Sequence, residues 1–142
     1  MILNAPQIIP LFFSGVTSAR LSLGKEIGLK PAESMILALV GANESLCIRE
    51  LKEKLKLRGS NINFTLNSLQ ERGLVRRVRG ANDKRFFYIV LTDKGTTLFQ
   101  QLSQAENKLV ASALSGTTPS ERKAVFNMME KLSYRENGKG VY

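Results

Sequence analysis

Residues 46–95 contain the pattern that most restricts how this chain can fold. Two short segments with helical apolar spacing come first, and an arginine-rich segment with a glycine follows them: LCIRELKEKLKL, RGSNINFTLNSLQERGLV and VRRVRGANDKRFFYIVLT. In the first segment Ile48, Leu51 and Leu55 are spaced to share one helix face. The second segment ends at Gly73, a residue typical of the position just after a helix. Helix, turn, helix and hairpin in this order predict a winged helix-turn-helix.

The second helix of this pair, at about residues 59–72, has an unusual outer face. Ile62, Leu66 and Leu69 lie within about 60° of one another on a helical wheel, so we expect them to face the core. The opposite side is uncharged and polar with one aromatic residue, and it consists of Ser60, Asn61, Asn63, Phe64, Asn67 and Ser68. Asn can pair with adenine through two hydrogen bonds, and Phe can contact a thymine methyl group. We therefore interpret this helix as one that reads bases in the DNA major groove; the alternative is a face that merely lacks charge.

The hairpin that follows carries most of its charge as arginine. Leu74–Arg79 and Arg85–Leu91 are predicted strands because both are rich in Val, Ile, Phe and Tyr. Gly80–Asp83 supplies the small and Asx residues that favour a turn. The hairpin contains one acidic residue, Asp83, and five basic ones: Arg76, Arg77, Arg79, Lys84 and Arg85. An edge hairpin kept soluble by charge would look similar. We favour a wing at about residues 76–91 that contacts phosphates and the minor groove.

The charge of the chain agrees with a polyanionic partner. The formal net charge is +9 and the isoelectric point is about 10.0. Twelve basic and five acidic residues lie between Leu46 and Gly95, so this third of the chain supplies most of the excess. Such an excess favours nucleic acid, and less often an anionic membrane, over a small-molecule substrate. The alternative is a protein that is merely basic.

The rest of the composition excludes several classes of protein. There is one cysteine, Cys47, and no histidine, so neither an intrachain disulfide nor a zinc site is expected. Neither a glycine-rich phosphate loop nor a catalytic constellation is found, and we expect no enzyme and no cofactor. No apolar run reaches the roughly 18 residues of a membrane span, and the segment Ile8–Phe13 lacks the basic start of a signal peptide. We expect a cytoplasmic, nucleoid-associated protein without a membrane partner.

Helical patterns continue on both sides of this region. Residues 11–27 predict a first helix, and a second begins at Pro31 and stops near Gly41. A long helix follows Thr92, and a last helix begins with Thr118, Pro119 and Glu121 as a capping box. The terminal helices carry apolar stripes at Phe12, Val16, Ala19, Leu23 and Ile27, at Leu98, Leu102, Ala105 and Leu109, and at Val125, Met128, Met129 and Leu132.

Such stripes must be buried, and a minimal winged helix has no place for them. Packing against a second copy would bury them and would present two recognition helices about one DNA turn apart. The alternative is a monomer whose ends fold back on its own core. We therefore expect a mainly α protein with a small β-wing that acts as a homodimer. Its predicted parts are an N-terminal dimerisation helix (1–30), a winged helix-turn-helix lobe (31–95) and C-terminal dimerisation helices (96–142).

With these elements placed, nearly the whole chain resembles the MarR (multiple antibiotic resistance regulator) family. LKEKLKLRGSNINFTLNSLQERGLVRR matches the family's helix-turn-helix stretch without a gap, with core positions at Leu51, Leu55, Leu57, Ile62, Leu66, Leu69, Gly73 and Leu74. DKRFFYIVLTDKG matches the end of the wing through Asp83, Arg85, Leu91, Thr92 and Gly95. The resemblance implies a homodimeric transcriptional regulator, either a repressor or an activator, that binds pseudo-palindromic double-stranded operators.

The resemblance also implies site residues. Arg85 would be the wing arginine that enters the minor groove, and Asp83 would orient it by a charge-assisted hydrogen bond. Phe64 stands where the family often has Arg, and Lys30 stands where Ser or Thr usually precedes the proline. With Thr65 added from the family, the predicted DNA-binding set is Arg58, Ser60, Asn61, Asn63, Phe64, Thr65, Asn67, Ser68, Arg76, Arg77, Arg79, Lys84 and Arg85.

Many relatives bind small aromatic acids between the dimer helices and the lobe. Phe12, Phe13 and Arg20 are candidates for such a pocket, although the two phenylalanines more ordinarily belong to a dimer core. Some relatives sense oxidants through a cysteine in the first helix, whereas Cys47 lies outside that helix, so we do not expect redox sensing. The main alternative function is an adaptor or anti-regulator that binds another protein through the recognition-helix face, where Phe64 would suit it.

Overall fold

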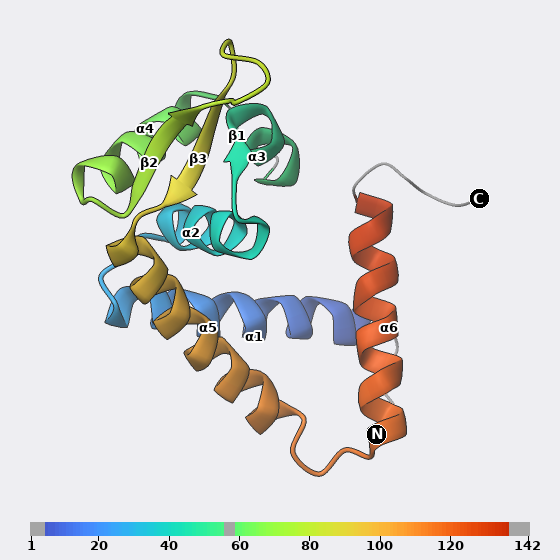
Figure 1. The fold of residues 1–142 in the computed structure, drawn as a ribbon. Coiled ribbons are helices and arrows are strands. Elements are labelled where there is room, and N and C mark those ends of the chain that lie inside the picture. The colour runs from blue at the N-terminus through green and yellow to red at the C-terminus, as the bar shows by residue number, and fades with distance from the viewer. Residues whose placement is uncertain (1–4, 56–58, 137–142) are drawn as a thin grey trace.

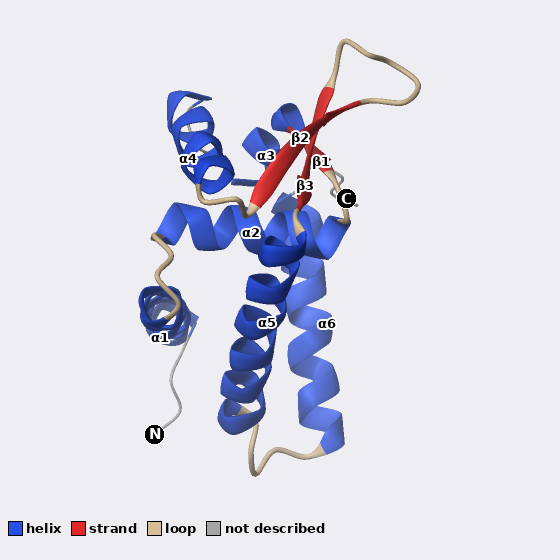
Figure 2. Cartoon of the chain, turned by 60° about the vertical axis from the view of Figure 1, so that its left-hand side comes forward, coloured by secondary structure: helices blue, strands red, loops and turns tan. Residues whose placement is uncertain are grey.

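The computed structural model describes residues 5–55 and 59–136, and it confirms the expected class, mainly helical with a small antiparallel sheet (Figure 1). Helices α2, α3 and α4 and the sheet form a packed lobe, from which α1, α5 and α6 extend (Figures 1 and 2). The elements are α1 (Ala5–Glu26), α2 (Pro31–Asn43), β1 (Leu46–Cys47), α3 (Ile48–Leu55), α4 (Gly59–Glu71), β2 (Val75–Arg79), β3 (Phe87–Leu91), α5 (Asp93–Ala113) and α6 (Pro119–Glu136).

The lobe is organised around one apolar core. Ile62, Leu66 and Leu69 of α4 are at most 1% exposed, so the predicted inward stripe of this helix is confirmed. Ile48 and Leu55 of α3 pack against the same core as partly buried side chains. The other buried members come from α2, β1, α3, β2, β3 and the adjoining loops, and they are Leu29, Ile36, Leu37, Val40, Leu46, Leu51, Leu74, Val75 and Ile89. Leu57, also predicted to be a core residue, lies outside the described residues.

The sheet has the strand order β1-β3-β2. Its β2–β3 hairpin was predicted, and it pairs from Val75 opposite Leu91 to Arg79 opposite Phe87. The hydrogen-bonded turn closes at Asp83–Phe86, three residues later than predicted. The strand β1 was not predicted, because two residues are too few to show a period of two.

The helix boundaries show two further differences. Helix α1 begins at Ala5 and includes Pro10, so it starts earlier than predicted. Helix α2 continues through Gly41 and ends at Asn43. Gly41 is therefore not a helix stop: an added Cβ would lie 2.5 Å from the ring of Phe99, so this glycine allows α5 to approach α2 closely.

Threonine N-caps begin the last two helices, and the one that was predicted, at Thr118, is confirmed. The Thr92 hydroxyl accepts a hydrogen bond from the Gly95 N–H (3.0 Å) at the start of α5. In α6 the Thr118 hydroxyl accepts from the Glu121 N–H (3.2 Å), and the Glu121 carboxylate accepts from the Thr118 N–H (2.7 Å). This reciprocal pair is a capping box.

The outer helices bury less than the lobe. Helix α1 packs against α5, where Arg20 forms an ion pair with Glu106 (3.1 Å). Helix α6 stands apart from the lobe (Figure 1), and its Phe126, Met128 and Met129 are 51%, 55% and 45% exposed. The described part of α6 thus does not fold back to cover its apolar side chains. Within residues 5–55 and 59–136, no helix combines the length and apolarity needed to cross a membrane.

Candidate nucleic-acid interface

Helix α4 presents an uncharged face to solvent. Asn61, Asn63, Phe64 and Asn67 are all exposed, and the Phe64 side chain is 71% exposed. This exposure follows from the opposite stripe, because the apolar residues of α4 anchor the helix in the core and turn these four residues outward. The predicted exposure of these side chains is confirmed, and the helix offers amide groups and one aromatic ring at its surface.

Two other predicted contacts of α4 are corrected. Thr65 is 8% exposed and its hydroxyl donates to the Asn61 carbonyl (2.8 Å). Its position, four residues before Leu69, puts it beside the core stripe rather than opposite it. Ser68 is half-buried and its hydroxyl donates to the Glu33 carboxylate (2.7 Å), because α2 packs along this side of α4. Arg58 and the Ser60 side chain lie outside what the structure describes.

A hydrogen bond connects the exposed face of α4 to the hairpin. The Arg77 guanidinium donates to the Asn67 side-chain carbonyl (2.9 Å). Arg79 is two residues further along β2, so it shares this face of the hairpin with Arg77. Its guanidinium lies 5.1 Å from the ring centroid of Phe87 on the neighbouring strand, within the range of a cation–π contact. The polar face of α4 therefore continues into a line of arginines along the hairpin.

Arg76 does not belong to this line. It is exposed, but it alternates with Arg77 along β2 and pairs with Val90, so its side chain leaves the opposite face of the hairpin. Two neighbouring arginines look equivalent in the sequence, and the orientation of the hairpin against α4 distinguishes them.

The wing tip carries the predicted Asp83–Arg85 pair. The Arg85 side chain donates twice to the Asp83 carboxylate, from Nε to Oδ1 (3.1 Å) and from Nη2 to Oδ2 (3.0 Å), and the Arg85 N–H also donates to Oδ1 (3.0 Å). These side-chain bonds, and then the backbone bond, lower the pKa of Asp83 below its usual value. The Arg85 side chain is still 87% exposed, so it is held in direction but open to a partner.

A buried carboxylate of α2, which was not predicted as a site residue, accepts hydrogen bonds from the C-terminal end of α4. Glu33 of α2 is 2% exposed. Burial by itself raises its pKa, but hydrogen bonds from the Lys30 N–H and the Ser68 hydroxyl, with the charge of Arg72, lower the pKa below the usual value. The sequence contained one signal for this residue, since a glutamate at the third position of a helix is typical of a capping box. The described residues contain no cluster of three or more potential metal ligands.

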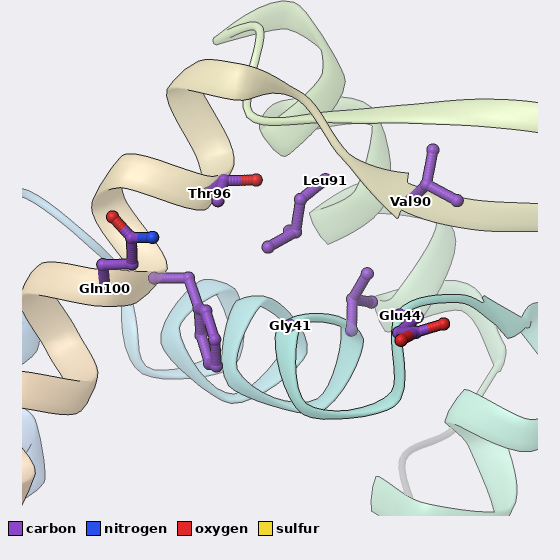
Figure 3. A pocket seen from close by; sticks show the side chains of 8 residues that line it. Gly41, Glu44, Val90, Leu91, Thr96 and Gln100 are labelled. Carbon is purple, nitrogen blue, oxygen red and sulfur yellow. The ribbon is translucent and has the colours of Figure 1, made fainter.

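A cavity of about 260 Å³ lies where α2, β3 and α5 meet, at the base of the lobe (Figure 3). Its lining is apolar with polar groups contributed by three residues, and it consists of Val40, Gly41, Glu44, Val90, Leu91, Thr96, Phe99 and Gln100. The predicted effector residues do not form it. Arg20 is paired with Glu106 elsewhere, and the side chains of Phe12 and Phe13 are outside the described part of the chain.

The chain is similar to known transcriptional regulators. A MarR family model matches residues 27–85, from the end of α1 to the wing tip. The uncharacterized HTH-type transcriptional regulator YkoM of Bacillus subtilis (strain 168) is 25% identical over 129 residues, which cover 91% of this chain and 84% of YkoM. The transcriptional repressor MdtR of the same organism is 26% identical over 106 residues, covering 75% of this chain and 68% of MdtR.

Solved structures share the fold at low sequence identity. A putative MarR family transcriptional regulator from Listeria monocytogenes, crystallised in complex with 26mer DNA, has a TM-score of 0.81 at 19% identity and covers 96% of this chain and 91% of its own. The reduced form of MarR from E. coli has a TM-score of 0.73 at 20% identity, with 93% and 98% covered. The matched family model spans α2, α3, α4 and the wing as far as Arg85. By this family model over residues 27–85, and by the curated relatives over most of its length, the chain is similar to the MarR family of winged helix-turn-helix transcriptional regulators.

Proposed function

We propose that this regulator binds double-stranded DNA as a homodimer, with α4 in the major groove and the wing in an adjacent minor groove. The observation that carries the proposal is the hydrogen bond between Arg77 and Asn67, which joins the uncharged face of α4 to the arginines of the hairpin. Base edges are read by amides and apolar groups, whereas phosphates are bound by cations. The two kinds of surface lie here in one continuous strip.

The residue types favour A·T base pairs at the centre of each half-site. Asn63 and Asn67 can form paired hydrogen bonds with adenine, and Phe64 can contact the thymine methyl group. Arg85 suits a narrow minor groove, where A-tracts concentrate negative potential that attracts arginine. We therefore expect A·T-rich operators in which the wing and α4 contact neighbouring base-pair steps.

The exposed apolar side chains outside the lobe support the homodimer. Leu109 and Val110 of α5 are 41% and 45% exposed, and Phe126 and Met128 of α6 are 51% and 55% exposed. A two-fold arrangement that covers them would present two copies of α4 to successive turns of the major groove. The expected operator is then a pseudo-palindrome.

One observation favours the competing function, an adaptor that binds another protein. Phe64 is 71% exposed on the recognition face, and aromatic side chains are enriched in protein interfaces. The two functions differ in salt dependence. DNA binding through several arginines weakens steeply as salt rises, with a slope set by the number of neutralised phosphates. A protein interface centred on Phe64 responds far less.

Selection of bound duplexes from a random library tests the proposal directly. The expected result is an enriched A·T-rich motif with two inverted half-sites, whose binding falls steeply between low and moderate salt. If no motif is enriched and the protein shows no salt-dependent affinity for duplex DNA, the proposal is wrong.

Two variants then separate the wing from the helix. Arg85→Ala should weaken binding to every duplex and reduce the salt slope by about one, whereas Asn63→Ala should weaken binding chiefly to the selected motif, by about 1–3 kcal/mol. Lys123→Ala, an exposed cation on α6, is the matched control and should change neither quantity. Equal losses on all duplexes for both variants would show that α4 does not read sequence.

A further inference from the structure

The C-terminal end of α4 is held by one buried carboxylate. Glu33 is 2% exposed, and both of its oxygens have partners. Its Oε1 accepts from the Ser68 hydroxyl (2.7 Å), and its Oε2 accepts from the Arg72 guanidinium (2.7 Å) and from the Lys30 N–H (2.9 Å). Ser68 and Arg72 are four residues apart and therefore lie on the same side of α4. The start of α2 is thus joined to two successive turns of α4.

Arg72 extends this connection to the outer helices. Its second guanidinium nitrogen donates to the Gly28 carbonyl (2.9 Å) in the turn between α1 and α2. The Arg72 carbonyl accepts from the Lys94 ammonium (2.9 Å), and the next carbonyl, of Gly73, accepts from the Thr92 hydroxyl (2.6 Å) at the start of α5. One end of α4 is therefore bonded to the end of α1 and to the beginning of α5.

Stability alone does not explain such an arrangement. Burial of the Glu33 carboxylate is costly, and the Arg72 side chain that pairs with it is 37% exposed, so the ion pair contributes little net stability. A planar guanidinium that donates to a carboxylate and to a carbonyl at the same time does fix the relative orientation of the segments that carry these groups, because its donors form a rigid fork. Lysine cannot reproduce this, since its ammonium group is a single point of charge. The Glu33–Arg72 ion pair is therefore better suited to fixing the orientation of α4 than to stabilising the fold.

A small rotation of α4 at its C-terminal end displaces its N-terminal end by a large distance. The helix has 13 residues, so it is about 20 Å long, and a rotation of about 10° at its C-terminus moves its N-terminus by roughly 3 Å. A displacement of that size breaks hydrogen bonds to base edges, whose donor–acceptor distances must stay near 3 Å. Phosphate contacts from long, exposed side chains tolerate it.

We infer that Glu33 and Arg72 form a clamp that sets the direction of α4 relative to α1 and α5, and that sequence-specific binding by the dimer depends on it. Both are positioning residues, and neither needs to touch DNA. The inference rests on the proposed function, because the outer helices matter for recognition only if they set the spacing of two copies of α4. Ser68, expected from the sequence to face DNA, acts here as the third member of the clamp.

The test compares the ratio of affinities for the selected motif and for a scrambled duplex of the same composition. Arg72→Lys keeps the net charge and removes the fork, so the ratio should fall at least tenfold while the affinity for the scrambled duplex and the salt slope stay unchanged. Arg122→Lys is the matched control, because the Arg122 guanidinium also bonds a backbone carbonyl, that of Thr117 (2.6 Å), at the turn before α6. It should keep the ratio of the wild type.

The outcomes separate failure of the clamp from failure of the proposed function. A wild type without a preferred duplex contradicts the proposed function. A wild type with a preferred duplex and an Arg72→Lys variant with the same ratio contradict the clamp. If Arg72→Lys does not fold, Ser68→Ala removes one hydrogen bond to Glu33 and should still lower the ratio by several-fold; an unchanged ratio overturns the clamp. Val40→Ala is the control for stability, because it removes part of a fully buried core side chain. It should lower the melting temperature without changing the affinity ratio. If this variant lowers the ratio as much as the clamp variants do, the clamp is also overturned.

Discussion

The winged-helix lobe and the helices outside it differ in how far their apolar side chains are buried. In the lobe, Leu51, Ile62 and Ile89 are completely buried by other residues of the same chain. In α6, Phe126 and Met129 remain about half exposed. The lobe can therefore reach its native packing within one chain. The outer helices can bury their apolar surface only against another surface, and in the proposed dimer that surface belongs to a second copy.

The same polar motif also acts differently in the two regions. Glu33 in α2 and Glu121 in α6 each accept a hydrogen bond from the backbone N–H three residues earlier. Glu121 is exposed and caps its own helix. Glu33 is buried, so its remaining lone pairs must find partners, and they do so on α4. Burial turns a local cap into a connection between helices.

The largest expected effect is in the core of the lobe. Leu66→Ala should destabilise the protein by about 2–5 kcal/mol, since it removes a fully buried side chain and leaves a cavity. Denaturant unfolding measured at two protein concentrations checks it, and the loss should be of similar size at both. A loss below about 1 kcal/mol would mean that the lobe does not depend on this core.

A smaller effect, on association and not on the lobe, is expected in α6. A fully buried Phe side chain contributes about 1.5–3 kcal/mol, so Phe126→Ala should weaken dimerisation at least tenfold for each copy of the side chain that is buried. Analytical ultracentrifugation over a range of concentrations measures the dissociation constant. The control is Lys123→Ala on the same helix. An unchanged dissociation constant for Phe126→Ala would place the dimer contact elsewhere.

The two threonine N-caps give a closer comparison, at about 1 kcal/mol each. Thr92→Ala should cost more than Thr118→Ala, because the Thr92 hydroxyl also donates to the Gly73 carbonyl at the end of α4. Thermal unfolding of both variants under identical conditions measures the difference. Equal losses would show that the link between α5 and α4 adds nothing to the cap.

The smallest expected effect is in the pH dependence of stability. The pKa of Glu33 is lowered in the folded protein, so its ionised form stabilises the fold at neutral pH. This contribution is lost as the pH falls below about 4.3, the usual value for a glutamate, towards the lowered pKa. Lys30 and Arg72 are the charged groups that lower this pKa. The difference in melting temperature between the wild type and Glu33→Gln should therefore shrink in acid; a constant or growing difference would contradict it.

Much of the fold was predictable because the relevant signals are local. The stripe of Ile62, Leu66 and Leu69, the cap at Thr118 and the pairing of Asp83 with Arg85 each depend on residues close together in the chain. Strand β1 and the clamp were missed. Glu33 is separated from Ser68 and Arg72 by more than thirty positions, and no periodic pattern connects residues that far apart.

The amino-acid sequence by itself determined the inward apolar stripe of α4, the N-cap of α6 and the strongly basic charge of the chain, because these properties follow from backbone periodicity, capping and composition. The tertiary structure alone decided which of two adjacent arginines, Arg76 or Arg77, lies beside α4, and whether Ser68 faces outward or inward. The physical reason is that a helix or hairpin has a fixed shape of its own, whereas its orientation depends on which neighbours it packs against.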